Sequence, residues 1–180
     1  MEKLWFHDAV ESLFSRGLKG RVDPALKAAL KPFIDLDRPL LPAYSAEAVE
    51  GTLLTVGAAL FAELPREQRL FTLGRLAFES FRGTLLGTAT VHALRLLGAR
   101  RAVERVQRGY RAACNYLEVT VTATSEKARR VEFAGAGGLA DFVAGTHQGV
   151  TEALGLPIDD AHWRYQVAGD GTVVIFLELP

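Results

Sequence analysis

Cysteine is almost missing from this sequence: Cys114 is the only one, so no disulfide can form within the chain. A single cysteine is typical of proteins from a reducing compartment, and we expect a cytoplasmic protein. Four histidines and one cysteine are also too few for a recognisable zinc-binding pattern, so we predict no metal site.

An excess of charge of either sign is missing as well, because 21 basic residues balance 21 acidic ones. This balance argues against a generally basic nucleic-acid binder, although it allows a local basic patch. Long apolar runs are absent too: residues 53–62 are too few to cross a bilayer, and residues 84–97 contain His92 and Arg95. The first eight residues do not resemble a signal peptide. We therefore expect no nucleic-acid partner and no membrane span.

The hydrophobic content is sufficient for a substantial core, since 49% of the 180 residues are apolar. We expect a single domain over residues 1–180. Its first part, residues 1–114, should be mainly helical, and residues 115–180 should form a sheet with one inserted helix. The division near Asn115 rests on a change of hydrophobic period from helical spacing to alternation.

Helices are predicted throughout the first part. Asp23 and Ser45 are good N-caps, and Pro24 suits a first helical position. The expected helices cover residues 24–31, 45–62, a segment that begins at 65, 84–97 and 99–108. The helix at 84–97 is apolar almost all round, so we expect it to be central. Residues 5–16 fit either a short helix or a strand.

Strands are predicted in the second part, where apolar residues alternate with polar ones. The expected strands lie at 117–123, around 131–133, at 163–167 and at 173–179, with a helix at 139–154. Asp170-Gly171 is a strong hairpin signal. The predicted class is α+β: an N-terminal layer of about four to six helices packed on a small four-stranded antiparallel sheet, in the order strand, strand, helix, strand, strand.

Three stretches resemble a myxobacterial paralogous family known only as a domain of unknown function: residues 36–44, 73–78 and 110–116. The similarity extends over most of the chain from about Val10. The order of elements is also remotely similar to a superfamily that holds haem-based nitric oxide/oxygen-binding domains and four-vinyl-reductase-type ligand-binding domains. The stretch from Tyr44 to Phe78 is similar to two successive helices of those domains. This resemblance implies a sensing or binding module.

This resemblance makes haem binding a hypothesis to consider. The haem-binding branch has an axial histidine and a Tyr-x-Ser-x-Arg motif that holds the propionates. The corresponding strand end here, Phe133 to Gly137, has no tyrosine, serine or arginine. His92 lies on an apolar helix, where a lone histidine is more often hydrogen-bonded than bound to iron. We therefore expect the haem-free branch and no cofactor.

The segment from Tyr110 to Tyr116 joins the helical part to the sheet, where a pocket would open between the two layers. The residues that we predict to contact a ligand are Phe78, Tyr110, Arg111, Cys114 and Asn115. The aromatic rings would form walls, and the arginine and asparagine would supply polar contacts. An equally good interpretation is a structural junction in which these groups satisfy backbone ends.

A basic stripe lies on the preceding helix, with Arg101, Arg105 and Arg108 at positions i, i+4 and i+7. One interpretation is a patch for an anion or an acidic partner. The other is a solvated helix face, which is what charge runs usually form.

Two groups of glycines indicate further features, a turn before the inserted helix and a packing position within it. Gly135-x-Gly137-x-x-Ala140 follows a strand and opens a helix, as in a dinucleotide site, although the preceding strand is too polar for the centre of a parallel sheet. A flexible strand-to-helix turn is the alternative. Gly145 and Gly149 predict close packing of the inserted helix against the sheet or a second copy of the chain.

The main functional hypothesis is a non-enzymatic regulatory module that binds a small apolar or amphipathic ligand or a protein partner. No catalytic set of residues is recognisable. The first alternative is an assembly protein with a filled core, for instance a homodimer. The second is an enzyme that binds a nucleotide at Gly135 to Ala140.

Overall fold

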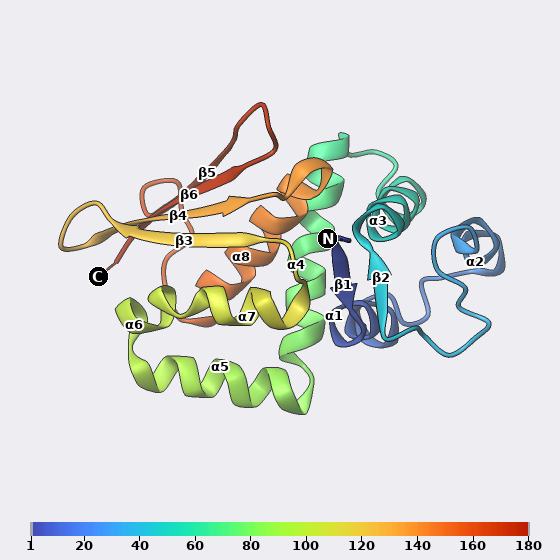
Figure 1. Ribbon diagram of the computed structural model, residues 1–180, viewed down its shortest axis with the longest axis horizontal. Helices are drawn as coiled ribbons and strands as arrows, with labels where there is room; N and C mark the ends of the chain where they lie inside the picture. Colours follow the sequence, from blue (N-terminus) through green and yellow to red (C-terminus); the bar gives the residue numbers. More distant parts are fainter. Residues whose placement is uncertain (1, 180) are drawn as a thin grey trace.

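The helical part comes first in the computed structural model, which describes residues 2–179 (Figure 1). A two-stranded sheet, β1 (Leu4–Phe6) with β2 (Ala43–Ser45), accompanies the helices. The helices are α1 (His7–Ser12), a π-helical turn (Leu13–Gly17), α2 (Pro24–Leu30), α3 (Ala46–Leu60), α4 (Arg66–Arg82), α5 (Leu85–Leu97), α6 (Ala99–Glu104) and α7 (Val106–Ala113).

A four-stranded antiparallel sheet follows, with the strand order β3-β4-β6-β5. Its elements are β3 (Glu118–Ala123), β4 (Ala128–Ala134), a 3-10 turn (Gly137–Leu139), α8 (Ala140–Ala153), β5 (Trp163–Val167) and β6 (Val173–Glu178). The α+β class and the order strand, strand, helix, strand, strand are confirmed. Figure 1 shows α7 and α8 lying along the sheet.

Alternation along the strands decides which side chains enter the core. On β4, Arg129, Val131 and Phe133 are buried, and the residues between them are partly exposed. On β6, Ile175 and Leu177 are buried in register with Val131 and Arg129. The inner face of the sheet is therefore apolar apart from one charged side chain, Arg129.

The predicted N-caps are present. The Asp23 carboxylate accepts a hydrogen bond from the Leu26 amide at 2.8 Å, and the Ser45 hydroxyl accepts one from the Ala48 amide at 3.1 Å. Each side chain satisfies an amide that the first helical turn leaves free, so α2 and α3 begin where the sequence indicates.

Helices α4 and α8 pack closely at the centre of the molecule. A β-carbon at Gly74 would overlap the carbonyl oxygen of Phe142, and one at Gly145 would overlap that of Phe71. The Thr146 hydroxyl also donates to the Gly74 carbonyl oxygen at 3.2 Å. The inserted helix packs closely at Gly145 as predicted, but its partner there is α4 of the same chain and not the sheet or a second copy.

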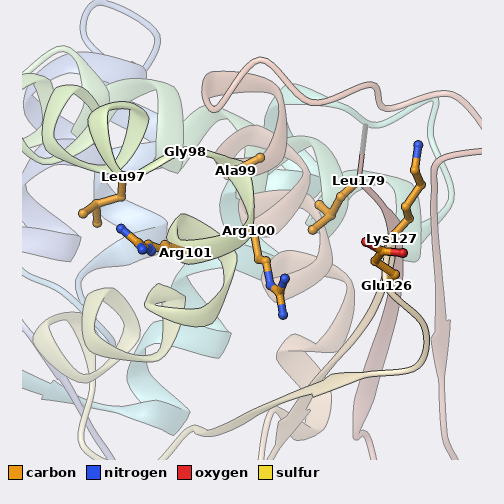
Figure 2. A pocket seen from close by; sticks show the side chains of 8 residues that line it. All are labelled: Leu97, Gly98, Ala99, Arg100, Arg101, Glu126, Lys127 and Leu179. Carbon is orange, nitrogen blue, oxygen red and sulfur yellow. The ribbon is translucent and has the colours of Figure 1, made fainter.

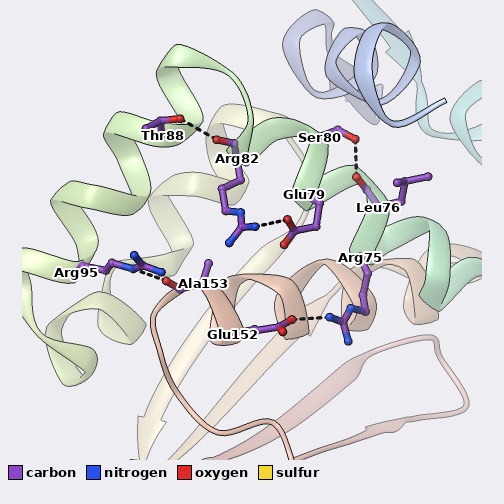
Figure 3. A network of polar contacts seen from close by, with 9 residues as sticks. All are labelled: Arg75, Leu76, Glu79, Ser80, Arg82, Thr88, Arg95, Glu152 and Ala153. Carbon is purple, nitrogen blue, oxygen red and sulfur yellow. Dashed lines mark hydrogen bonds and ion pairs between the residues drawn. The ribbon is translucent and has the colours of Figure 1, made fainter. Parts of the chain in front are cut away.

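Helix α5 is peripheral, so the prediction that residues 84–97 are central was wrong (Figure 1). Only Gly87 and Val91 of α5 are buried, whereas Leu85 is 92% exposed and Leu96 is 76% exposed. A helix that is apolar all round does not reveal which face is covered. Figure 3 shows one of its attachments, a 2.6 Å hydrogen bond from Arg95 to the Ala153 carbonyl oxygen at the end of α8.

Other boundaries differ from the sequence expectation. The helix predicted at 99–108 divides at Arg105 into α6 and α7, and α7 continues to Ala113. Residues 5–16 contain both a strand and a helix, because β1 pairs with β2 from Leu4 to Phe6 before α1 begins. Between residues 2 and 179, no helix combines the length and hydrophobicity that a membrane crossing requires.

Candidate functional site

A cleft of about 440 Å³ lies between the corner that joins α5 to α6 and the turn that joins β3 to β4 (Figure 2). Its lining residues are Leu97, Gly98, Ala99, Arg100, Arg101, Glu126, Lys127 and Leu179. Figure 2 shows Arg100 extending into the space between the two walls, whereas Arg101 extends toward Leu97. We call this feature the corner cleft.

Local structure fixes both walls of the corner cleft. Gly98 has a φ of +77°, a value that favours glycine, and it both ends α5 and precedes α6. On the other wall, the Ser125 hydroxyl accepts a 3.0 Å hydrogen bond from the Ala128 amide and stabilises the β3–β4 turn. The Leu179 amide donates to the Lys127 carbonyl oxygen at 2.7 Å, which places Leu179 beside this turn.

Arg129, near the start of β4, is not a lining residue of the corner cleft, but it lies two residues after Lys127, which is one, and only 1% of its surface is exposed. Its Nη1 atom donates to the carbonyl oxygens of Ser125, Glu126 and Ala128 at 3.1, 3.3 and 2.9 Å. The Nε and Nη2 atoms of Arg129 have no hydrogen-bond partner in the described structure. The guanidinium group therefore supports the turn with one nitrogen and leaves two buried nitrogens unsatisfied.

Glu104, the last residue of α6, is the acidic group nearest to this guanidinium in the described ion pairs. Its Oε1 atom lies 3.8 Å from Arg129 Nη2 and 3.5 Å from Arg100 Nε. The 3.8 Å separation is too long for a hydrogen bond, so Glu104 neutralises charge without satisfying the Arg129 donor. With Arg101 and Lys127 close by, cations outnumber carboxylates around the corner cleft.

A second cleft, of about 700 Å³, lies between α2 and α3. Its lining is mainly apolar and includes Leu26, Leu54 and several alanines, with Arg21 and Asp23 as its charged residues. Its charged lining residues are thus one cation and one carboxylate, whereas three cations and one carboxylate line the corner cleft. The corner cleft is therefore the stronger candidate for a specific polar site.

The residues predicted to contact a ligand are placed elsewhere, and none of the five lines either cleft. Tyr110 is buried edge-to-face against Phe133, with ring centroids 4.8 Å apart. Burial raises the pKa of the Tyr110 hydroxyl well above its usual range, and this hydroxyl has no partner in residues 2–179. The Cys114 thiol is buried beside Tyr110 and donates to its carbonyl oxygen at 3.6 Å, and burial also raises the pKa of this thiol.

The remaining three predicted residues are not brought together with this pair. Asn115 binds the backbone of the N-terminal strand, accepting from the Leu4 amide at 2.8 Å and donating to the Glu2 carbonyl oxygen at 3.0 Å. Arg111 is exposed. Phe78 is buried in a small separate cluster with Val91 and Ala153. The placement of Asn115 matches the alternative interpretation, in which the junction satisfies backbone ends.

The basic stripe is exposed along α6 and α7, and one member, Arg101, lines the corner cleft. Arg105 and Arg108 do not line it. Lys127 and Arg129 were not among the site residues predicted from the sequence. A signal was available for Arg129, because alternation puts it on the same face of β4 as Val131 and Phe133.

The glycine turn lacks the geometry of a dinucleotide site. β4, which precedes it, pairs antiparallel with both of its neighbours, whereas the dinucleotide motif belongs to a parallel sheet. The Glu50 carboxylate lies against Gly138, where it would repel a pyrophosphate, and Arg66 donates to the Gly138 carbonyl oxygen at 3.2 Å. The positive φ values of Gly135 and Gly137 fit the other interpretation, a strand-to-helix turn.

The chain belongs to a protein family of unknown function, DUF2378, whose model matches residues 3–168. This match covers most of the chain and confirms the family resemblance seen in the sequence. None of the curated proteins compared with the chain matches it.

Solved structures of H-NOX proteins share the fold. An H-NOX protein designated Tt matches with a TM-score of 0.68 and 11% identity, over 99% of this chain and 95% of that one. One from S. oneidensis has a TM-score of 0.63 and 13% identity, over 96% and 95%. One from K. algicida has a TM-score of 0.60 and 12% identity, over 100% and 97%. Identities this low establish the fold alone.

Haem is implied by this fold family, since related H-NOX structures are described with haem and one with bound oxygen. The residues of this chain do not fit it. An axial ligand needs a histidine beside open space for the porphyrin. His92 is exposed on α5, His147 is enclosed in the core against Phe133, and neither cleft is lined by a histidine. The described residues also contain no cluster of three or more His, Cys, Asp or Glu that could hold a metal ion.

Proposed function

We propose that this protein is a haem-free, non-enzymatic regulatory module that binds a small amphipathic molecule in the corner cleft. The observation that carries the proposal is the combination of apolar and cationic groups there, with Leu97 and Leu179 beside Arg100 and Lys127. Such a lining can bury an alkyl or aromatic group and also pair with a charged head group. The lining supplies groups for binding but no nucleophile with an adjacent base.

The fold supports this proposal by analogy, because proteins with related folds sense ligands. The corner cleft also touches both halves of the molecule, the α5–α6 corner and the far end of the sheet. A ligand that bound one arrangement of these two halves more tightly than another would shift the equilibrium between them, which is what a regulatory module requires. We further propose that the protein works in the reducing cytoplasm, in keeping with the single buried thiol of Cys114.

Thermal unfolding with added amphiphiles tests this function. We expect decanoate or dodecyl phosphate at about 100 times Kd to raise Tm by several degrees, since such saturation adds about 3 kcal/mol of stability. Ala99→Trp should fill the corner cleft and abolish the rise. Ala25→Trp, in the α2–α3 cleft, is the matched control and should keep it. A rise that survives Ala99→Trp, or no rise with any amphiphile, would refute the proposed site.

A second candidate function is assembly, and the exposed leucines of α5 favour it. Leu85 and Leu96 are the most exposed large apolar side chains in the described part of the chain. The inserted helix α8 is an unsuitable interface, because most of its residues are buried between α4 and the sheet. We propose a homodimer through α5. Light scattering should then give the dimer mass for the native protein and the monomer mass for a Leu85→Glu/Leu96→Glu variant.

A further inference from the structure

We infer that the corner cleft contains an oxyanion-binding subsite in which Arg129, Arg100 and Lys127 bind the carboxylate or phosphate head group of a ligand. The inference rests on the proposed ligand-binding function and specifies the chemistry of its head group. Three independent observations support it: the unsatisfied guanidinium of Arg129, the position of Glu104, and the excess of cations around the cleft.

The guanidinium of Arg129 needs a partner that the described chain does not supply. A buried charged donor without a hydrogen bond is strongly unfavourable, and native structures leave few such groups unexplained. Here two of its nitrogen atoms, Nε and Nη2, lack partners while 1% of the side chain is exposed. These two atoms form one edge of the guanidinium plane, which can bind a carboxylate or a phosphate through two parallel hydrogen bonds.

The orientation of Arg129 directs this edge toward the cleft region. Its third nitrogen, Nη1, is held by carbonyl oxygens of the β3–β4 turn, which forms one wall. Nη2 faces Glu104 at the end of α6, which continues from the other wall. Arg129 does not itself line the cleft, but Glu104 connects it to the lining residue Arg100: the same Glu104 oxygen lies 3.5 Å from Arg100 and 3.8 Å from Arg129. A head group that displaced Glu104 beside Arg100 would therefore meet the free edge of Arg129.

Glu104 occupies the place that an external oxyanion would take. Its carboxylate is loosely held, 3.8 Å from Arg129 and 3.5 Å from Arg100, and about half of its side chain is exposed. A side chain so placed can rotate into solvent at little cost. A ligand oxyanion that displaced it would gain the unused hydrogen bonds of Arg129 and the charge of Arg100.

The charges around the cleft favour an anion over a neutral or cationic head group. Arg100, Arg101 and Lys127 line it, and Glu126 is the single acidic residue of the lining. Arg100 and Lys127 belong to opposite walls; in Figure 2, Arg100 extends into the space between the walls, whereas the Lys127 side chain extends away from Arg100. Cations on both walls give the cleft a positive potential that favours carboxylates and phosphates.

The direct test is NMR of the Arg129 side chain. Phosphate and acetate are titrated separately at constant ionic strength, and the Nε–Hε signal of Arg129 is followed. We expect a saturable shift with at least one of them, and the stronger of the two identifies the head group as phosphate-like or carboxylate-like. If neither anion gives a saturable shift, water satisfies Arg129 and the inference is wrong.

Three variants separate specific binding from general attraction. In these variants, binding is followed on the backbone amides of residues 126–128. Arg129→Met should abolish the saturable response. The matched control Arg130→Met should keep it, because Arg130 lies on the other face of β4 and pairs with Glu132. Glu104→Gln should bind the anion about three- to tenfold more tightly, since it removes a competing charge. If Arg129→Met does not fold, Glu104→Gln still tests the inference. An affinity of Glu104→Gln for the anion that is unchanged or weaker than that of the native protein would overturn it.

A pair of amphiphiles distinguishes failure of the subsite from failure of the proposed function. Decanoate and decanol differ only in the head group, so decanoate should bind and decanol should bind at least about tenfold more weakly. Equal binding of both in the corner cleft would keep the proposed function and overturn the subsite. Saturable phosphate binding without any binding of decanoate or dodecyl phosphate would support the subsite and count against the proposed function.

Discussion

Gly145 of α8 lies directly against the backbone of Phe71 in α4, so close that a β-carbon at Gly145 would overlap the Phe71 carbonyl oxygen. Backbone contact of this kind sets the closest approach of two helices, because neither main chain can make room for an added atom without disturbing its own helix. α4 and α8 form the centre of the molecule, and the sheet packs on α8 (Figure 1). The arrangement of α4, α8 and the sheet therefore depends on this contact.

Gly145→Ala should accordingly destabilise the protein by about 3 kcal/mol or more, because the added methyl group overpacks a rigid contact. Gly74→Ala should have a similar effect, since its β-carbon would overlap the Phe142 carbonyl oxygen. Gly109→Ala in α7 is the control: nothing lies within 4 Å of its β-carbon, and alanine favours helix by up to about 1 kcal/mol. Urea unfolding measures all three. Equal effects at Gly145 and Gly109 would contradict the packing described.

His147 should make the folded protein sensitive to mild acid. Burial lowers the pKa of this histidine from 6.5 to about 3, and its ring is enclosed by Phe133 and Thr151. The folded state therefore binds the proton less readily than the unfolded state. The stability is complete above about pH 7 and falls as the pH drops from 6.5 toward 3, by about 2 kcal/mol between pH 7 and pH 5.

The comparison of native protein with His147→Gln isolates this effect, because both proteins keep every carboxylate. The free energy of unfolding should fall between pH 7 and pH 5 in both proteins. The fall should be about 2 kcal/mol smaller in His147→Gln than in the native protein. If the two proteins lose equal stability between these pH values, the imidazole of His147 is accessible to protons in the folded state and its placement in the core is wrong.

Cys114 should be unreactive in the folded protein. Its thiol is buried beside Tyr110, and burial raises its pKa, so little of the reactive thiolate is present at neutral pH. We expect a thiol reagent such as DTNB to react at least about 100-fold more slowly with the native protein than in concentrated urea. Rapid native labelling would show that Cys114 faces open space, as a residue in contact with a ligand would.

Absorption spectroscopy checks the claim that haem does not bind. The protein expressed with an ample supply of haem should show no Soret band, because no histidine lines the described clefts. A stoichiometric Soret band that is lost in His92→Ala or His147→Ala would contradict the account and would identify the axial ligand.

The sequence allowed the fold class to be predicted because the change of period near Asn115 reflects burial directly. The alternation on β4 and β6 and the Asp170-Gly171 turn are local features, and they determine the sheet. Helix α5 was misplaced because its apolar residues surround it, and the pairing of β1 with β2 was missed because strands of three residues are too short to show alternation.

The corner cleft could not be predicted from the sequence in the same way. Its walls come from residues 97–101, 126–127 and 179, which no local pattern connects. Arg129 could have been recognised as a buried charge from the register of β4, but its partner Glu104 lies on another element. The predicted junction at Tyr110 to Asn115 had the composition of a pocket, and the structure fills it with an aromatic contact and hydrogen bonds to β1.

The most direct test of the central claim, that this fold binds a small amphipathic ligand in the corner cleft, is backbone amide NMR mapping with decanoate. The account predicts saturable shifts that are largest at residues 97–101 and 126–129. Shifts centred on residues 110–116 or on the α2–α3 cleft, or no saturable shift with decanoate or dodecyl phosphate, would contradict it.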